Sequence, residues 1–171
     1  GDLNLTNVGF RGMGVKKDLR YDFSLMYRQQ KHGVKLHIEL QDSAGNLLGS
    51  AILIPSDESK SWHKQGVSLV SNATGMKASL HIWFEGDGII DLDMISLFPE
   101  DTWKHRAGGM RADMIRKLAD MKPGFIRFPG GCIVEGYDLA ERYQWKKTIG
   151  PVEDRQLIIN RWNFEFPHRP T

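Results

Sequence analysis

Apolar and polar residues alternate through most of residues 1–99 of this chain. Because successive side chains of a β-strand point to opposite faces, such alternation predicts strands with one buried face and one solvated face. Clusters of turn-forming residues, such as residues 43–46, separate the alternating segments. Short strands at this spacing indicate an antiparallel β-sandwich. The segments that we expect to form its strands are 21–28, 34–40, 51–54, 66–70, 78–84 and 91–98.

The pattern of apolar residues changes after Pro99. Residues 108–121 carry apolar side chains at helical spacing with charged side chains opposite, which predicts an amphipathic helix. Residues 123–124, proline and glycine, end that helix because proline removes a backbone donor and glycine relaxes the turn. Residues 125–128 then predict a short apolar strand. A helix followed by a strand is typical of an α/β fold, so we interpret residues 100–171 as a linker and the first part of a larger α/β domain.

The composition excludes several classes of protein. The 171 residues are 40% hydrophobic and 26% charged, which is typical of a globular protein with an apolar core. The net charge of +2 is too small to indicate binding to nucleic acid or to a membrane, so we expect neither partner. The single cysteine excludes an internal disulfide. No apolar run approaches the roughly 18 residues that a membrane-spanning helix needs.

A turn of sequence Pro129-Gly130-Gly131-Cys132 follows the expected strand. In α/β folds ligands bind at the carboxyl ends of strands, and two glycines let a backbone approach a ligand closely. Cys132 is a candidate for a nucleophile, a ligand contact or a small buried side chain. We favour the last two interpretations, because no histidine lies between His105 and His168. Arg127, one step before the end of the expected strand, points either into such a site or to solvent.

Two further clusters have both a functional and a structural interpretation. Asp91 and Asp93 share one face of the last expected sandwich strand, where they either hold a structural calcium or form a polar outer face. The polar face is the favoured interpretation, and no other cofactor is expected. The histidines lack metal-ligand spacing, which argues against a zinc site. Four aromatic residues form either a sugar-stacking platform or part of the core, and the core is favoured: Tyr27, Trp62, Trp83 and Phe84.

Several stretches that begin at Leu92 carry specific motifs. They are LDMISLFPEDTW at residues 92–103, GMRAD at 109–113 and LADMKPGFIRFPGGCIVEG at 118–136, continued by residues 143–155, 161–163 and 166–169. In this order, these motifs resemble the α-L-arabinofuranosidases of glycoside hydrolase family 51. Residues 1–98 are similar to the carbohydrate-binding-module-like sandwich that one subgroup carries ahead of most of its barrel. That sandwich is of the jelly-roll, galactose-binding-like type.

The resemblance implies an incomplete (β/α)8 barrel from a parent enzyme that removes terminal arabinofuranosyl residues from plant cell-wall polysaccharides such as arabinan or arabinoxylan. It also implies a retaining mechanism, in which one glutamate protonates the leaving oxygen and another forms the glycosyl-enzyme intermediate. Both catalytic glutamates are missing by this analogy, so we expect the chain alone to be inactive and its parent to continue past Thr171. The late glutamates that match neither motif are Glu135, Glu141, Glu153 and Glu165.

The same resemblance implies roles for four residues. It places Arg127, Gly131 and Cys132 in the wall of the arabinose subsite, with Cys132 contacting a sugar hydroxyl. Trp162 aligns with a family tryptophan at the rim of that pocket. The implied partner is an arabinose-containing oligosaccharide or polysaccharide, and a homo-oligomeric parent, secreted or periplasmic, is compatible with the family.

Two other functions stay open on the sequence. In the first alternative, the sandwich is a non-catalytic module that binds carbohydrate or serves as a structural spacer. In the second, the chain is a free-standing cysteine enzyme, which has little support because no base accompanies Cys132 in the sequence.

Overall fold

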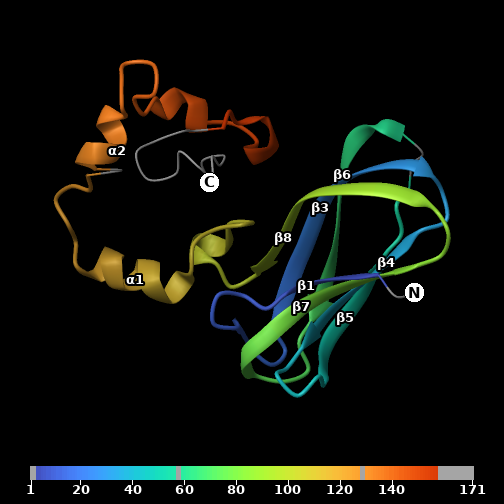
Figure 1. Ribbon diagram of the computed structural model, residues 1–171. Helices are drawn as coiled ribbons and strands as arrows, with labels where there is room; N and C mark the ends of the chain where they lie inside the picture. The colour runs from blue at the N-terminus through green and yellow to red at the C-terminus, as the bar shows by residue number, and fades with distance from the viewer. Residues whose placement is uncertain (1–2, 57–58, 128–129, 158–171) are drawn as a thin grey trace. The chain divides into compact units, whose positions relative to one another are not determined.

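The alternating segments form β-strands in the computed structural model, which describes residues 3–56, 59–127 and 130–157. The chain divides into two compact units, residues 1–120 and 121–171. All strands found among the described residues belong to the first unit (Figure 1). The predicted domain boundary at residue 99, where the last strand ends, stays a prediction.

The strands of the first unit form two antiparallel sheets, as the sequence predicts. In the larger sheet the strands follow the order β1-β7-β4-β5, and β2 pairs with β7 as well. The bounds of these strands are β1 Asn4–Asn7, β2 Met13–Val15, β4 Lys35–Gln41, β5 Leu47–Leu53 and β7 Gly75–Glu85. The smaller sheet has the order β6-β3-β8, with bounds β3 Arg20–Lys31, β6 Ser59–Val70 and β8 Ile89–Pro99.

A single apolar core lies between the two sheets. Every second side chain of β3 from Tyr21 to Tyr27 is buried, and so are Leu36, Ile38 and Leu40 of β4. Burial of a side chain of this size contributes about 2 kcal/mol to the stability of the fold. The alternation therefore fixes which face of each strand points inward, because a shift of one residue would expose the whole apolar set.

The chain leaves the sandwich through a tight loop that ends in a helix. Trp103, in a 3-10 helix at Trp103–His105, donates its backbone N–H to the carbonyl oxygen of Met110 at 2.8 Å, and Thr102 forms an isolated bridge with Arg111. Helix α1 therefore begins only at Ala112 and ends at Asp120, so it is shorter than the predicted helix over residues 108–121. No helix in the described part of the chain is long and apolar enough to cross a lipid bilayer.

The strand that we predict over residues 125–128 is not seen in its described part, residues 125–127. Residues 125–127 have no regular secondary structure, and Phe128 lies outside the described residues. Phe125 and Ile126 are 84% and 79% exposed. A strand needs a neighbour for its backbone N–H and C=O groups, and no ladder partner for this segment occurs among the described residues. The second unit instead contains helix α2 (Gly131–Glu135) and two 3-10 helices, Trp145–Thr148 and Val152–Asp154.

Candidate functional site

The Pro-Gly-Gly turn leads directly into α2. Gly130 precedes the helix with φ = 133°, a conformation that residues with a side chain rarely adopt. A Cβ atom placed on Gly131 would lie 3.7 Å from Nη2 of Arg127. The guanidinium group of Arg127 therefore reaches back over the first residue of α2, and the missing side chain of Gly131 leaves space beside it.

The loop after α2 fixes the end of that helix. Gly136 has φ = 69°, and a Cβ atom there would lie only 2.7 Å from the backbone of Glu141. The backbone N–H of Tyr143 donates to the carbonyl oxygen of Val134 at 3.1 Å. Asp138 accepts hydrogen bonds from the next turn, with its Oδ1 at 2.8 Å from the amide of Ala140. These contacts hold the chain on both sides of Gly136 in one arrangement.

Two of the four predicted subsite residues are brought together by the structure. Arg127 is exposed and lies beside Gly131, with Cys132 next in the first turn of α2. The side chain of Cys132 and the whole of Trp162 lie outside what the structure describes. A hollow of about 180 Å³ in this unit contains none of the predicted residues and is lined by Ala140, Glu141, Arg142, Tyr143, Gln144, Lys147 and Leu157. Arg127 and Gly131 are thus exposed neighbours, and the arabinose subsite stays a prediction.

The acidic pair on β8 is engaged with neighbouring groups. Oδ2 of Asp91 accepts a hydrogen bond from Nε of Arg28 at 2.6 Å, and Oδ1 of Asp93 accepts one from the backbone N–H of Met94. Within the described ranges, no group of three or more His, Cys, Asp or Glu side chains has an arrangement that could hold a metal ion. Arg28 bonds to one carboxylate oxygen of Asp91, and the calcium site stays a prediction.

The aromatic residues divide between the core and the outer faces. Tyr27 is buried in the core and Phe84 packs against it, as predicted. The core interpretation is wrong for the two tryptophans. Trp83 lies on the outer face of the larger sheet, where its ring stacks on His37, and Trp62 is 41% exposed on the smaller sheet. Alternation explains the position of Trp83, which follows the buried Ile82.

The environment of Trp83 is a polar network that the sequence analysis missed. Its indole N–H donates to Oε1 of Glu39 at 2.8 Å, while Oε2 of the same carboxylate accepts from Gln41. The hydrogen bond from Trp83 is the main reason that the pKa of Glu39 lies below its usual value. Nε2 of His37 lies 2.8 Å from Glu85. Part of the signal was present in the sequence, since His37, Glu39 and Trp83 alternate with the apolar side chains of the segments 34–40 and 78–84.

Comparison with known proteins links these features to one enzyme family. The family model described as "Alpha-L-arabinofuranosidase 1 domain" matches residues 117–166. An arabinose-bound α-L-arabinofuranosidase, MgGH51, superimposes with a TM-score of 0.79 and 34% identity over 92% of this chain and 26% of that chain. The chain matches a segment of the family 51 α-L-arabinofuranosidases. The resemblance stated from the motifs is thereby confirmed.

Curated relatives agree with this family. An extracellular exo-α-L-arabinofuranosidase of Streptomyces chartreusis is 34% identical over 94% of this chain and 20% of the relative. α-L-Arabinofuranosidase 1 of Arabidopsis thaliana is 36% identical over 91% of this chain and 23% of the relative. The chain therefore spans less than a quarter of the length of both curated arabinofuranosidases.

Proposed function

We propose that this chain is part of a retaining α-L-arabinofuranosidase that removes terminal arabinofuranosyl residues from plant cell-wall polysaccharides. The observation that carries the proposal is the likeness to arabinose-bound MgGH51, which extends over 92% of the chain at 34% identity. The likeness covers the sandwich as well as the segment with the motifs. Arabinose-containing oligosaccharides and polysaccharides are the corresponding ligands, and a homo-oligomeric parent stays a prediction.

In this proposal the segment around α2 forms one wall of the arabinose subsite. The guanidinium of Arg127 presents several N–H donors, which suit the hydroxyl groups of a furanose ring. Gly131 lets the sugar approach the backbone, and the Arg127 side chain 3.7 Å from its Cβ position supports a shared role. Cys132 contacts a sugar hydroxyl through its thiol, and Trp162 provides an apolar surface at the rim.

The proposed reaction needs two carboxylates that this chain does not provide by family analogy. In retaining glycosidases the acid and the nucleophile lie about 5–5.5 Å apart, on either side of the scissile bond. None of the four late glutamates matches either catalytic motif. The chain therefore contributes substrate binding, and the chemical step depends on residues of a longer protein.

The test compares this chain with a longer protein that contains it. An aryl α-L-arabinofuranoside is incubated with each, and release of the aryl group is followed together with the anomeric configuration of the product by NMR. We expect no turnover by the 171-residue chain, and turnover with retention by the longer protein. Robust turnover by the 171-residue chain alone would contradict the proposal, since catalytic carboxylates would then have to lie within it.

A further inference from the structure

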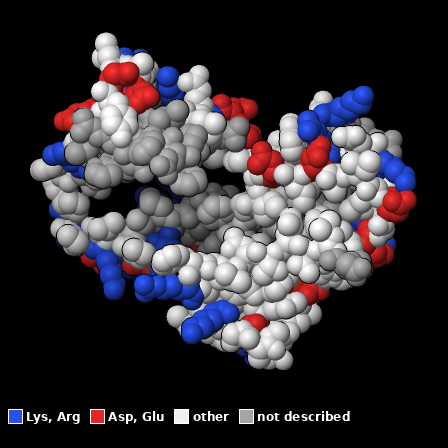
Figure 2. All heavy atoms as spheres, in the orientation of Figure 1, with Lys and Arg blue, Asp and Glu red and all other residues white. Residues whose placement is uncertain are grey.

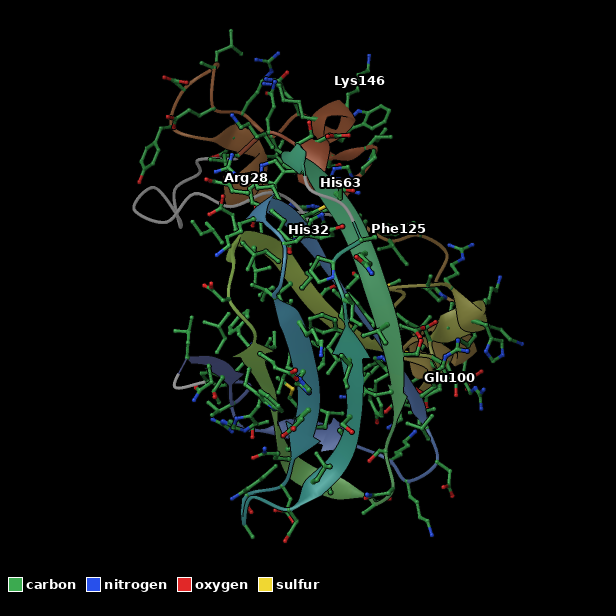
Figure 3. The ribbon with its side chains drawn as sticks, turned by 90° about the vertical axis from the view of Figure 1, so that its right-hand side faces the viewer. Arg28, His32, His63, Glu100, Phe125 and Lys146 are labelled. Atoms are coloured by element: carbon green, nitrogen blue, oxygen red, sulfur yellow. The ribbon has the colours of Figure 1, made fainter. Side chains whose placement is uncertain are left out.

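The outer face of the smaller sheet carries a basic hollow at the end where β6 begins. The hollow has a volume of about 290 Å³ and is lined by Arg28, Gln30 and Lys60. Figure 3 shows Arg28 near this end of the sandwich, and Figure 2 shows Lys and Arg atoms there with Asp and Glu atoms beside them. Arg28 and Gln30 lie two residues apart on β3, and Lys60 and Trp62 lie two apart on β6, the strand paired with it.

Arg28 is held in a fixed position at this hollow. Its Nε donates to Oδ2 of Asp91 on β8 at 2.6 Å, in register with the strand pairing. Its Cζ lies 5.0 Å from the centroid of the Trp62 ring, which is the geometry of a cation–π contact. One edge of the guanidinium is thus used for anchoring, while its Nη groups make no hydrogen bond among the described residues.

The other two lining side chains have free donors. The side chains of Lys60 and Gln30 form no hydrogen bond or ion pair within the described ranges, and both residues are exposed. Lys31 and Lys35 differ from Lys60 in this respect, because Lys31 pairs with Asp87 at 2.8 Å and Lys35 with Glu85 at 2.9 Å. Among the described side chains, the hollow and its anchor combine two cations, Arg28 and Lys60, with one carboxylate, Asp91. Asp57 and Glu58, which precede Ser59 in the chain, lie outside the described residues.

We propose that this hollow binds the carboxylate of an acidic glycan, with a neighbouring sugar ring against Trp62. Arg28 and Lys60 both donate to carboxylate oxygens, and the Gln30 amide suits a sugar hydroxyl. The exposed 41% of Trp62 offers an apolar surface to the carbon face of a sugar. The choice of a glycan rests on the proposed function, while the choice of an acidic one rests on the charges of the hollow.

The tryptophan of the larger sheet is a less suitable place for the same ligand. The indole N–H of Trp83 is already bonded to Glu39, and His37 and Lys35 are both bonded to Glu85. The polar groups of that face are therefore satisfied by one another. Its two carboxylates would also repel an acidic sugar, whereas the donors beside Trp62 are free to bind one.

The experiment titrates the 171-residue chain with a glucuronic-acid-substituted xylo-oligosaccharide by calorimetry. The matched ligand is the same oligosaccharide after reduction of its carboxyl group to an alcohol. We expect the acidic oligosaccharide to bind about fivefold more tightly than the reduced one, and its binding to weaken as salt is added.

Two lysine variants test the role of the hollow. Lys60→Gln should weaken binding of the acidic oligosaccharide by about fivefold. Lys77 is an exposed lysine on β7, and Lys77→Gln should leave that binding unchanged. Trp62→Ala should weaken both ligands, with circular dichroism verifying the fold of each variant.

Several results would overturn the proposal. Equal affinity for the acidic and reduced forms would show that charge is not recognised, and no binding at millimolar ligand would remove the site altogether. Equal competition by poly-glutamate would show that the hollow attracts any acidic polymer rather than a glycan. None of these results depends on hydrolysis. The binding experiment therefore tests the acidic-glycan site, and the turnover assay separately tests the proposed arabinofuranosidase function.

Discussion

The imidazole ring of His37 stacks on the indole ring of Trp83, with centroids 3.5 Å apart and planes 6° from parallel. The two residues face each other across the β4–β7 pair. Glu39, two residues along β4, accepts the hydrogen bond from the same indole. One aromatic side chain therefore organises the polar outer face of the larger sheet, and the behaviour of that face in acid follows from it.

Glu39 should make the stability of the sandwich depend on pH. Its folded-state pKa is lowered, first by the hydrogen bond from Trp83, so it contributes stability above its unfolded-state pKa that is lost as the pH falls through the folded value. We expect Glu39→Gln to flatten the fall in the free energy of unfolding below about pH 4.5. Urea unfolding at several pH values between neutral and acid measures the free energy of unfolding of both proteins. If this free energy falls with pH equally steeply in Glu39→Gln and in the unchanged chain, Glu39 does not cause the pH dependence.

Burial should decide the cost of the same substitution on two adjacent strands. Ile38 of β4 is fully buried, whereas Ile52 of β5 is 54% exposed. We expect Ile38→Ala to lower the free energy of unfolding by about 2–5 kcal/mol, because it leaves a cavity in the core. Ile52→Ala should change it by about 0.5 kcal/mol or less. Denaturant unfolding of the two variants compares them, and equal losses would contradict the assigned register.

Two strand glycines should respond differently to the same methyl group. A Cβ atom on Gly66 would lie 2.7 Å from the carbonyl oxygen of Phe23, while one on Gly14 would meet nothing within 4 Å. Gly66→Ala should therefore cost about 1–3 kcal/mol, since the backbone of the paired strand must move. Gly14→Ala should leave the thermal midpoint unchanged or slightly raised. Differential scanning calorimetry measures the thermal midpoint of both variants. An unchanged midpoint in Gly66→Ala would show that β3 and β6 separate easily.

Arg127 should bind substrate in a longer protein that contains this chain. Loss of a hydrogen-bonding charge from a subsite lowers kcat/KM by about 10- to 100-fold, so we expect this range for Arg127→Ala on an aryl arabinofuranoside. Arg116→Ala removes an exposed arginine of α1 and serves as the matched control. Steady-state kinetics compare the two variants, and equal effects would mean that Arg127 lies outside the subsite.

Cys132 should be dispensable for the chemical step. If its thiol contacts only a sugar hydroxyl, Cys132→Ala in the longer protein should lower kcat/KM by less than about tenfold. Removal of a nucleophile instead lowers kcat by about 10⁴-fold or more. The same kinetic assay separates these outcomes. A decrease of about 10⁴-fold in kcat would support the nucleophile interpretation instead.

The segment after α1 shows where sequence reasoning fails. Phe125 and Ile126 have the composition of a strand, yet they are exposed and irregular. Strand propensity describes how a side chain fits a pleated surface, and it does not supply the neighbouring strand that completes the hydrogen bonds. α2 was missed for a related reason, since five residues that begin with a glycine carry too short a pattern to indicate a helix.

The sequence by itself determined the sandwich and the likeness to the family 51 arabinofuranosidases. Alternation is a local property of the extended backbone, so Tyr21 and Phe23 could be assigned to the core before any pairing was known. The motifs from Leu92 to Gly136 likewise identified the arabinofuranosidases without a structure. Only the tertiary structure decided which side chains meet across strands. Arg28 reaches Asp91 and Trp62 through pairing of β3 with β8 and β6, and such contacts depend on register between segments distant in the chain.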